Sequence, residues 1–173
     1  MGDKYFDLDR DELLEMLDFL EEDVENVRRV AKFIEEKDID AEFLFHGKSE
    51  SAKDSAEKTD LDLDQIVKTL VFKTGNDFVA VLCPGDSRVS EQSLEDLTGS
   101  KVRMAKPSEV ENHTGYIVGG VSPFDLDIDV FMDISIPEKD LVRPAAGSRV
   151  VGVELEPEEL VRALNPSIED ICR

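Results

Sequence analysis

A lysine inside an apolar strand is the first residue of this sequence that could do chemistry. In the stretch from Ile66 to Lys73, six of the eight residues are β-branched or apolar, which predicts a strand buried on at least one face. An ammonium group taken out of water needs an anion or a carbonyl oxygen beside it. Lys68 therefore either extends its charged end back to solvent, as lysines commonly do, or points into a polar cavity. The strand by itself leaves both alternatives open.

A glycine-rich loop is the second candidate. Gly119 and Gly120 are adjacent and are followed by Val121, Ser122 and Pro123. Glycines let the backbone approach a ligand closely, and successive N–H groups of such a loop can converge on an oxyanion or a carbonyl oxygen. A plain turn between strands explains the spacing equally well. The loop is not a nucleotide-phosphate motif, because no Gly-Lys-Ser/Thr follows it.

Residues typical of other catalytic sites are scarce. The only histidines are His46 and His113, so Ser122 has no evident partners for a nucleophilic triad. Carboxylates alternate along residues 125–129, and we interpret them as a solvent-exposed strand face because no further ligand spacing supports metal binding. We expect neither a metal nor a cofactor.

Short strands and short helices have to position these residues. The turn Gly75-Asn76-Asp77 would join the Lys68 strand to an apolar return strand as a hairpin. The remaining pattern predicts strands at 39–45, 78–83, 101–105, 128–133 and 150–155, and helices at 51–58, at 93–98, from 107 and at 157–164. The strict strand-then-long-helix rhythm of a doubly wound fold is missing. We therefore predict an α/β (α+β) domain with a mixed, largely antiparallel sheet.

An amphipathic helix is predicted at residues 9–37, either continuous or broken near Glu22-Asp23. The stretch has no glycine or proline, and its apolar residues recur at spacings of three and four. A chain of 173 residues is long enough for one ordinary core. We therefore expect an acidic N-terminal helical extension at residues 1–38 and one domain at residues 39–173.

The net charge of −21 is unevenly distributed. Residues 1–64 carry 22 acidic and 9 basic side chains, whereas residues 65–124 carry 7 and 6. This excess argues against binding to DNA or non-specifically to RNA, but it allows contact with one RNA end at the near-neutral middle. No apolar run is long enough to span a membrane, no signal peptide is evident, and Cys83 and Cys172 lack disulfide or zinc spacing. We expect a cytoplasmic protein with ordinary thiols.

Together these segments resemble the YbaK/prolyl-tRNA synthetase-associated editing-domain family. The residues that carry the resemblance are Gln65 to Phe72, Pro84-Gly85-Asp86, Thr114-Gly115-Tyr116, Gly119 to Phe124, Ala146-Gly147-Ser148 and Leu155 to Leu160. The likeness extends from about residue 39 to residue 171. It implies a compact domain in which the mixed sheet curls toward a barrel with helices around it.

The resemblance also implies an activity and a site. The activity is hydrolysis of the ester that joins a wrong amino acid to the 3′ end of a tRNA, typically alanine or cysteine on tRNA(Pro). In that family the lysine that matches Lys68 is required, and it is the predicted catalytic residue. The predicted substrate-binding residues are Thr69, Gly119, Gly120, Val121, Ser122, Pro123, His46 and Gly147.

The chemistry of such a substrate suits these residue types. An aminoacyl ester is already activated, so an enzyme mainly has to hold the carbonyl, stabilise the oxyanion and admit a water. We expect Lys68 to face the Gly119 and Gly120 amides across the pocket, with the ribose 2′-OH or a substrate thiol assisting the attack. The expected partner is a mischarged tRNA, with a synthetase as a further candidate, and the protein would be a monomer or a homodimer. The alternative is a non-catalytic module that binds a tRNA end or a synthetase.

Two positions depart from the family pattern. Asp125 stands where family members usually have glycine, and this could reshape the pocket rim or repel RNA phosphate. Gly152 stands where, in our alignment, the cysteine-specific branch has an aspartate. The second departure weakens the case for cysteine as the amino acid removed.

Overall fold

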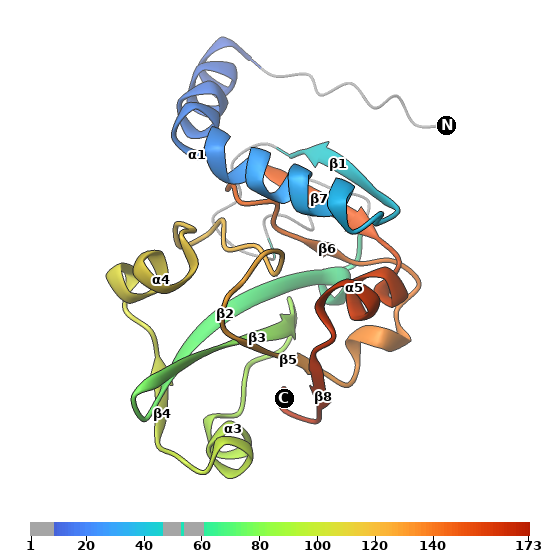
Figure 1. The fold of residues 1–173 in the computed structure, drawn as a ribbon. Helices are drawn as coiled ribbons and strands as arrows, with labels where there is room; N and C mark the ends of the chain where they lie inside the picture. The colour runs from blue at the N-terminus through green and yellow to red at the C-terminus, as the bar shows by residue number, and fades with distance from the viewer. Residues whose placement is uncertain (1–8, 47–52, 54–60) are drawn as a thin grey trace.

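The structure is a computed structural model that describes residues 9–46, 53 and 61–173 (Figure 1). Its α-helices are α1 (Arg10–Glu36), α3 (Glu91–Thr98), α4 (Pro107–Thr114) and α5 (Pro157–Leu164). Its strands are β1 (Ala41–Phe45), β2 (Ile66–Thr74), β3 (Asp77–Pro84), β4 (Val102–Met104), β5 (Asp129–Asp133), β6 (Arg143–Pro144), β7 (Val151–Leu155) and β8 (Ser167–Glu169). The helix predicted at 51–58 lies outside the described residues except for Lys53. The sequence did not indicate β6 and β8, because two or three residues are too few to show alternation.

Helix α1 is continuous, so the alternative with a break near Glu22-Asp23 is wrong. Its start is fixed by a capping box, in which Asp9 accepts from the Asp11 and Glu12 amides at 2.9 Å and Glu12 accepts from the Asp9 amide at 3.0 Å. The C-terminal half packs on the body of the protein through buried side chains such as Val30. The N-terminal half projects beyond the body (Figure 1).

The β2–β3 hairpin forms the centre of the sheet. The two strands pair antiparallel from Val67 and Pro84 to Thr74 and Asp77, and the turn between them contains Gly75 at φ +60°. On its other edge, β2 pairs with β6 over residues 66–67 and with β4 over residues 72–74. Residues 68–70 of β2 therefore have no partner strand on this edge within the described part of the chain.

The remaining strands complete a mixed fold. β3 pairs in parallel with β5, and β5 pairs in parallel with β8. β1 and β7 form an antiparallel pair, which isolated bridges connect to the β6 region. Since the longest pairings are antiparallel, the predicted mixed, mostly antiparallel α/β fold is confirmed. The described pairings do not return from β8 to β1, so the curling toward a barrel stays a prediction.

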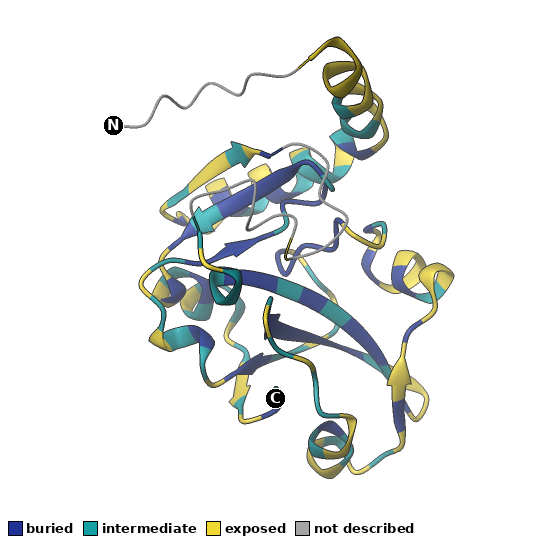
Figure 2. Ribbon diagram, turned by 180° about the vertical axis from the view of Figure 1, so that it is seen from behind, coloured by how far each residue is buried: buried dark blue, intermediate teal, exposed yellow. Residues whose placement is uncertain are grey.

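Alternation along β2 sends its side chains to two hydrophobic clusters. Val67 and Val71 belong to the larger core beneath α1, whereas Leu70 and Phe72 contact a smaller cluster that includes Leu94. Neighbouring strand residues point to opposite faces, so the two clusters cover the two faces of the hairpin. Figure 2 shows the hairpin as one of the most buried parts of the fold. Burying a side chain of this size contributes about 1.5–3 kcal/mol, and the hairpin is therefore a firm base for a site.

Candidate functional site

A cavity of about 320 Å³ lies at the edge of β2, between β4 and β6. Its wall consists of residues 66–71 of β2, Met104 and Ala105 after β4, Val110 of α4, Val118, Gly119 and Val121, residues 143–145 of β6, His46 and Ser148. Apolar side chains dominate this wall, and only a few polar groups interrupt it. A concave, mainly apolar cavity with a few polar groups is typical of a small-molecule site.

Lys68 belongs to the wall, and its ammonium group bonds a protein carbonyl. Lys68 pairs with Cys83 in the hairpin, and alternation places its side chain on the face opposite to Thr69. Its Nζ donates to the carbonyl oxygen of Ser87 at 2.5 Å. Ser87 lies in the loop after β3 and is not part of the wall. The ammonium group is therefore engaged by a protein carbonyl, and its predicted contact with the Gly119 and Gly120 amides stays a prediction.

Thr69 brings an unsatisfied hydroxyl to the cavity. The residue is 8% exposed, and its Oγ1 has no hydrogen-bond partner among the described residues. It lies at the point of β2 that neither β4 nor β6 covers. Leaving a buried hydroxyl unpaired costs about 1–3 kcal/mol. A ligand atom that bonds Thr69 would recover this free energy.

The glycine loop reaches the cavity through Gly119 and Val121. Gly119 has φ +94°, a conformation that favours glycine. A Cβ atom at Gly120 would lie 3.0 Å from the backbone of Ser148, so only glycine fits there. The Gly120 amide donates to the carbonyl of Ile117 at 2.9 Å. The two glycine amides therefore do not both point at the cavity, contrary to our expectation.

Four of the predicted substrate-binding residues lie outside the wall of the cavity: Gly120, Ser122, Pro123 and Gly147. Ser122 is fully buried, and its Oγ accepts from the Phe124 amide at 3.4 Å. Gly147 has φ +82°, and a Cβ there would lie 2.9 Å from the backbone of Asn26 in α1. These residues are turned toward the core and α1, so they support the wall instead of forming it.

Arg143 and His46 form the polar end of the cavity, and only His46 was predicted. The Arg143 side chain is 10% exposed, and its Nη2 donates to Glu154 at 2.5 Å. Both side chains lie beside Gly152: a Cβ there would be 3.1 Å from the Arg143 side chain and 3.5 Å from His46. Residue exposure of 6% places His46 inside the fold. An arginine beside a proline in an irregular segment gives no sequence signal for a site, and for this reason Arg143 was missed.

Asp125 is part of a clamp between α1 and the glycine loop. Its φ of +56° is a left-handed conformation, which gives a physical reason for the usual glycine at this position. Arg29 Nε donates to the Asp125 carboxylate at 2.7 Å, and Arg29 Nη1 donates to the Thr114 carbonyl at 2.6 Å. The same guanidinium lies 4.4 Å from the centre of the Tyr116 ring, and burial raises the pKa of Tyr116 to about 12. Asp125 therefore pairs with a cation and is not part of the cavity rim.

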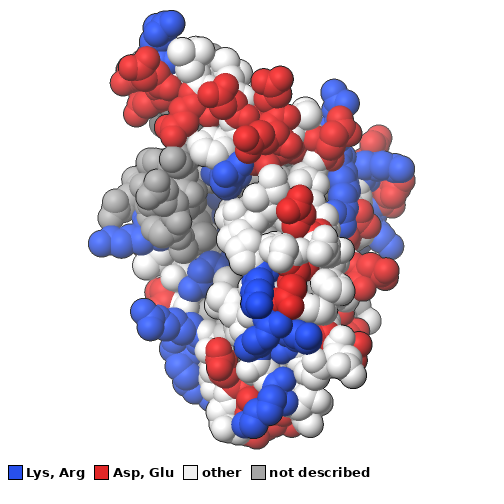
Figure 3. All heavy atoms as spheres, turned by 90° about the vertical axis from the view of Figure 1, so that its left-hand side faces the viewer, with Lys and Arg blue, Asp and Glu red and all other residues white. Residues whose placement is uncertain are grey.

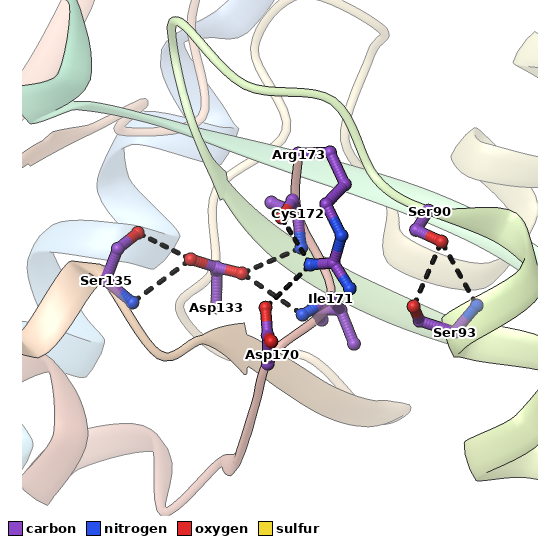
Figure 4. A network of polar contacts seen from close by, with 8 residues as sticks. All are labelled: Ser90, Ser93, Asp133, Ser135, Asp170, Ile171, Cys172 and Arg173. Atoms are coloured by element: carbon purple, nitrogen blue, oxygen red, sulfur yellow. Dashed lines mark hydrogen bonds and ion pairs between the residues drawn. The ribbon is translucent and has the colours of Figure 1, made fainter.

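The hairpin face that carries Lys68 is closed by the C-terminal segment. Asp133 accepts from the Ser135 amide and hydroxyl at 3.0 and 2.5 Å, and from the Ile171 and Cys172 amides at 3.2 and 2.8 Å (Figure 4). Burial by itself would raise the pKa of Asp133, but these hydrogen bonds outweigh it and hold the pKa below its usual range. A hydrogen bond with Cys172 lowers the pKa of Cys83. Asp133 of β5 thus holds the C-terminal segment in place. Cys172 of this segment contacts Cys83 of β3, which is the strand neighbour of Lys68.

Charge is segregated on the surface. Figure 3 shows acidic side chains crowded over α1, with lysines and arginines more frequent below it. The described residues contain no group of three or more His, Cys, Asp or Glu side chains placed to hold a metal ion. In the same part of the chain, no helix has the length and apolarity needed to cross a bilayer.

The fold and the cavity define an α/β domain with a candidate ligand site at a sheet edge. A family model of the aminoacyl-tRNA editing domain matches residues 46–163. The chain therefore belongs to the aminoacyl-tRNA editing domain family. All residues of the cavity wall lie inside the matched segment.

Known proteins agree with this assignment. The uncharacterised protein YwhH of Bacillus subtilis is 35% identical over 119 residues, which cover 67% of this chain and 76% of YwhH. EbsC of Enterococcus faecalis, named as a candidate Cys-tRNA(Pro)/Cys-tRNA(Cys) deacylase, is 29% identical over 75% of this chain and 82% of its own. The proline–tRNA ligase of Caldicellulosiruptor bescii is 39% identical over 74 residues, and the match spans only 13% of that ligase.

Two solved structures share the fold. The crystal structure of hypothetical protein APE2540 superposes with a TM-score of 0.79 and 29% identity, over 84% of this chain and 99% of that one. A structure described as a candidate trans-editing enzyme for prolyl tRNA synthetase gives a TM-score of 0.80 and 25% identity, over 86% of this chain and 97% of that one. The predicted family is thereby confirmed.

Proposed function

We propose that this protein is a trans-acting editing deacylase that hydrolyses the ester of a mischarged tRNA. The observation that carries the proposal is the position of the cavity, whose whole wall lies within the editing-family segment 46–163. The aminoacyl group would be alanine, cysteine or another small residue, and tRNA(Pro) is the first tRNA to test. The names of EbsC and of the trans-editing structure support this choice.

The proposed reaction places the aminoacyl group in the cavity and the terminal nucleotide at its mouth. A water attacks the ester carbonyl carbon, the bond to the ribose oxygen breaks, and that oxygen takes up a proton. The ribose 2′-OH or a substrate thiol assists the attack, since Ser122 is fully buried and lies outside the cavity wall. The Gly119 amide is the donor we assign to the developing oxyanion, because the Gly120 amide is used by Ile117.

In the proposed reaction, Lys68 has a different role from the contact with the ester that the sequence predicted. Its ammonium group binds the carbonyl of Ser87, in the loop after β3. Exchange of this carbonyl for an oxygen of the terminal nucleotide would hold the tRNA end beside the cavity. We assign Lys68 to substrate positioning at the mouth, where a cation also offsets the acidic surface of the chain.

A non-catalytic binding module is the second candidate function. It is favoured by the two donors expected to act on the ester, since Lys68 and the Gly120 amide both bond protein carbonyls. Such a module would bind a tRNA end or a synthetase in the same cavity without turnover. Binding without release of the amino acid, across several mischarged tRNAs, would support it.

The test is deacylation of Ala-tRNA(Pro) and Cys-tRNA(Pro) by the wild type and by Lys68→Ala. We expect kcat/KM of the variant to fall at least about 100-fold, the scale expected when a reacting substrate is deprived of one charge-assisted hydrogen bond. Lys73→Ala is the matched control, since Lys73 lies on the same strand but is not part of the cavity wall. Full activity in Lys68→Ala with an unchanged circular dichroism spectrum would refute the role of Lys68.

The division of the chain remains part of this proposal. Residues 39–173 would form the editing domain, and residues 1–38 an acidic extension. In the structure, the second half of α1 covers the core through Val30 and Ile34, and Arg29 of the same helix donates to Asp125, which follows the glycine loop. The extension would therefore hold the cavity wall in place, whereas its projecting first half remains available for a tRNA, a synthetase or a second copy.

A further inference from the structure

A buried arginine gives the cavity a hydrogen-bond donor that the proposed reaction does not use. Arg143 belongs to the wall, its side chain is 10% exposed, and its Nε has no partner among the described residues. Most buried donors in native proteins are paired, because an unpaired one has lost water and gained nothing in exchange. An unpaired donor in the wall of a ligand cavity is therefore a place for a ligand oxygen.

The guanidinium is held in a fixed position. Glu154 accepts from Nη2 at 2.5 Å, which anchors one edge of the group. The aliphatic part of the Arg143 side chain packs against Gly152. A Cβ atom added to Gly152 would lie 3.1 Å from both Cγ and Cδ of Arg143. Gly152 is thus what lets the arginine lie flat along β7. A rigid donor discriminates between ligands better than a mobile one, because less freedom is lost when the ligand binds.

The charge of Arg143 is balanced before any ligand arrives. Glu154 is 21% exposed and pairs with the guanidinium, so a second carboxylate at this end would be repelled by Glu154. A methyl group would leave the Nε–H unpaired, and a thiol is only a weak acceptor. A hydroxyl is neutral and accepts well. Thr69 Oγ1 is a second buried atom of the wall without a hydrogen-bond partner among the described residues, and such a ligand could bond it as well.

We infer that Arg143 makes this site selective for aminoacyl esters whose side chain carries a hydroxyl, with serine as the smallest member of the class. The inference rests on the proposed function and narrows it. The ester carbonyl is assigned to Gly119, in a different segment of the wall, so the donor of Arg143 is left for the side chain. Arg143 is then a specificity-determining residue, and Gly152 is its positioning residue.

The test uses a pair of substrates that differ by one oxygen. Ser-tRNA(Pro) and Ala-tRNA(Pro) are prepared on the same tRNA with an acylating ribozyme, and kcat/KM is measured for each. A hydrogen bond to a charged group predicts a serine preference of about 10- to 100-fold in the wild type. The double variant Arg143→Met/Glu154→Gln removes donor and counter-charge together, so no unpaired carboxylate remains. We expect the ratio of its kcat/KM for serine to its kcat/KM for alanine to fall to within about threefold of unity.

Each outcome decides the inference. A serine preference that the double variant abolishes supports it, and Gly152→Ala should then weaken the same preference by displacing the arginine. Equal rates on both esters in the wild type, or equal losses on both in the variant, would overturn it and leave the deacylase proposal intact. If the wild type releases neither amino acid, the deacylase proposal fails. In that case the selectivity is tested by binding of non-hydrolysable seryl and alanyl 3′-amides of adenosine. Equal dissociation constants for the two amides would overturn the inferred selectivity.

Discussion

Replacing Asp133 with asparagine tests whether the C-terminal segment is held against the hairpin as the structure shows. The Asp133 carboxylate accepts four hydrogen bonds, two from Ser135 and one each from the Ile171 and Cys172 amides. An asparagine has one acceptor oxygen, so in either amide orientation one pair of donors meets an NH₂ group.

The magnitude follows from the hydrogen bonds that the substitution removes. Hydrogen bonds to charged groups are worth about 1.5–3 kcal/mol each, and the Ser135 hydroxyl can rotate to accept instead. We therefore expect the free energy of unfolding to fall by about 2–5 kcal/mol, a large part of the 5–15 kcal/mol typical of a domain. Urea unfolding followed by far-ultraviolet circular dichroism measures it. Asp170→Asn is the control, because Asp170 is exposed and pairs only with Arg173 at 2.6 Å in a contact worth less than about 0.5 kcal/mol.

The same network predicts a pH dependence. The pKa of Asp133 is lower in the folded state than its unfolded value of about 3.9. A lowered folded-state pKa stabilises the protein above the unfolded pKa, and this stabilisation is lost as the pH falls through the folded value. The stability difference between wild type and Asp133→Asn should therefore be full at neutral pH and shrink below about pH 4. A variant within about 1 kcal/mol of the wild type at pH 7 would refute the network as described.

Two further substitutions probe residues that lie outside the cavity wall and support it. Gly120→Ala places a methyl group 3.0 Å from the Ser148 backbone and should cost about 1–3 kcal/mol in urea unfolding, and unchanged stability would contradict the close approach. Arg149→Met removes the cation 3.8 Å from Asp23, which is 1% exposed, and should cost about 2–4 kcal/mol. Arg28→Met, at an exposed pair, should change the melting temperature little, and a similar loss in both arginine variants would argue against a specific role of Asp23.

Local sequence patterns were sufficient for most secondary-structure elements and for the family. The apolar run of β2, the Gly75 turn, and helix α5 with its early proline are set by neighbouring residues, because strand period, turn conformation and proline geometry act over a few positions. The alternative of a helix broken near Glu22-Asp23 was wrong for a local reason as well, since no glycine or proline there interrupts the helix. The lysine strand and the glycine loop together also indicated the editing-domain family.

The cavity itself was decided only by the tertiary structure. It exists because β4 and β6 cover two ends of one edge of β2 and leave Thr69 between them, and a sequence pattern does not show which strands pair with each other. The Lys68 ammonium bonds the carbonyl of Ser87 in the loop after β3, and spacing along the sequence cannot say which loop returns to a given side chain. Arg143 became part of the cavity because Gly152, on the neighbouring strand β7, leaves room for its side chain. Local residue order thus determined which elements form, whereas long-range packing determined which side chains share a site.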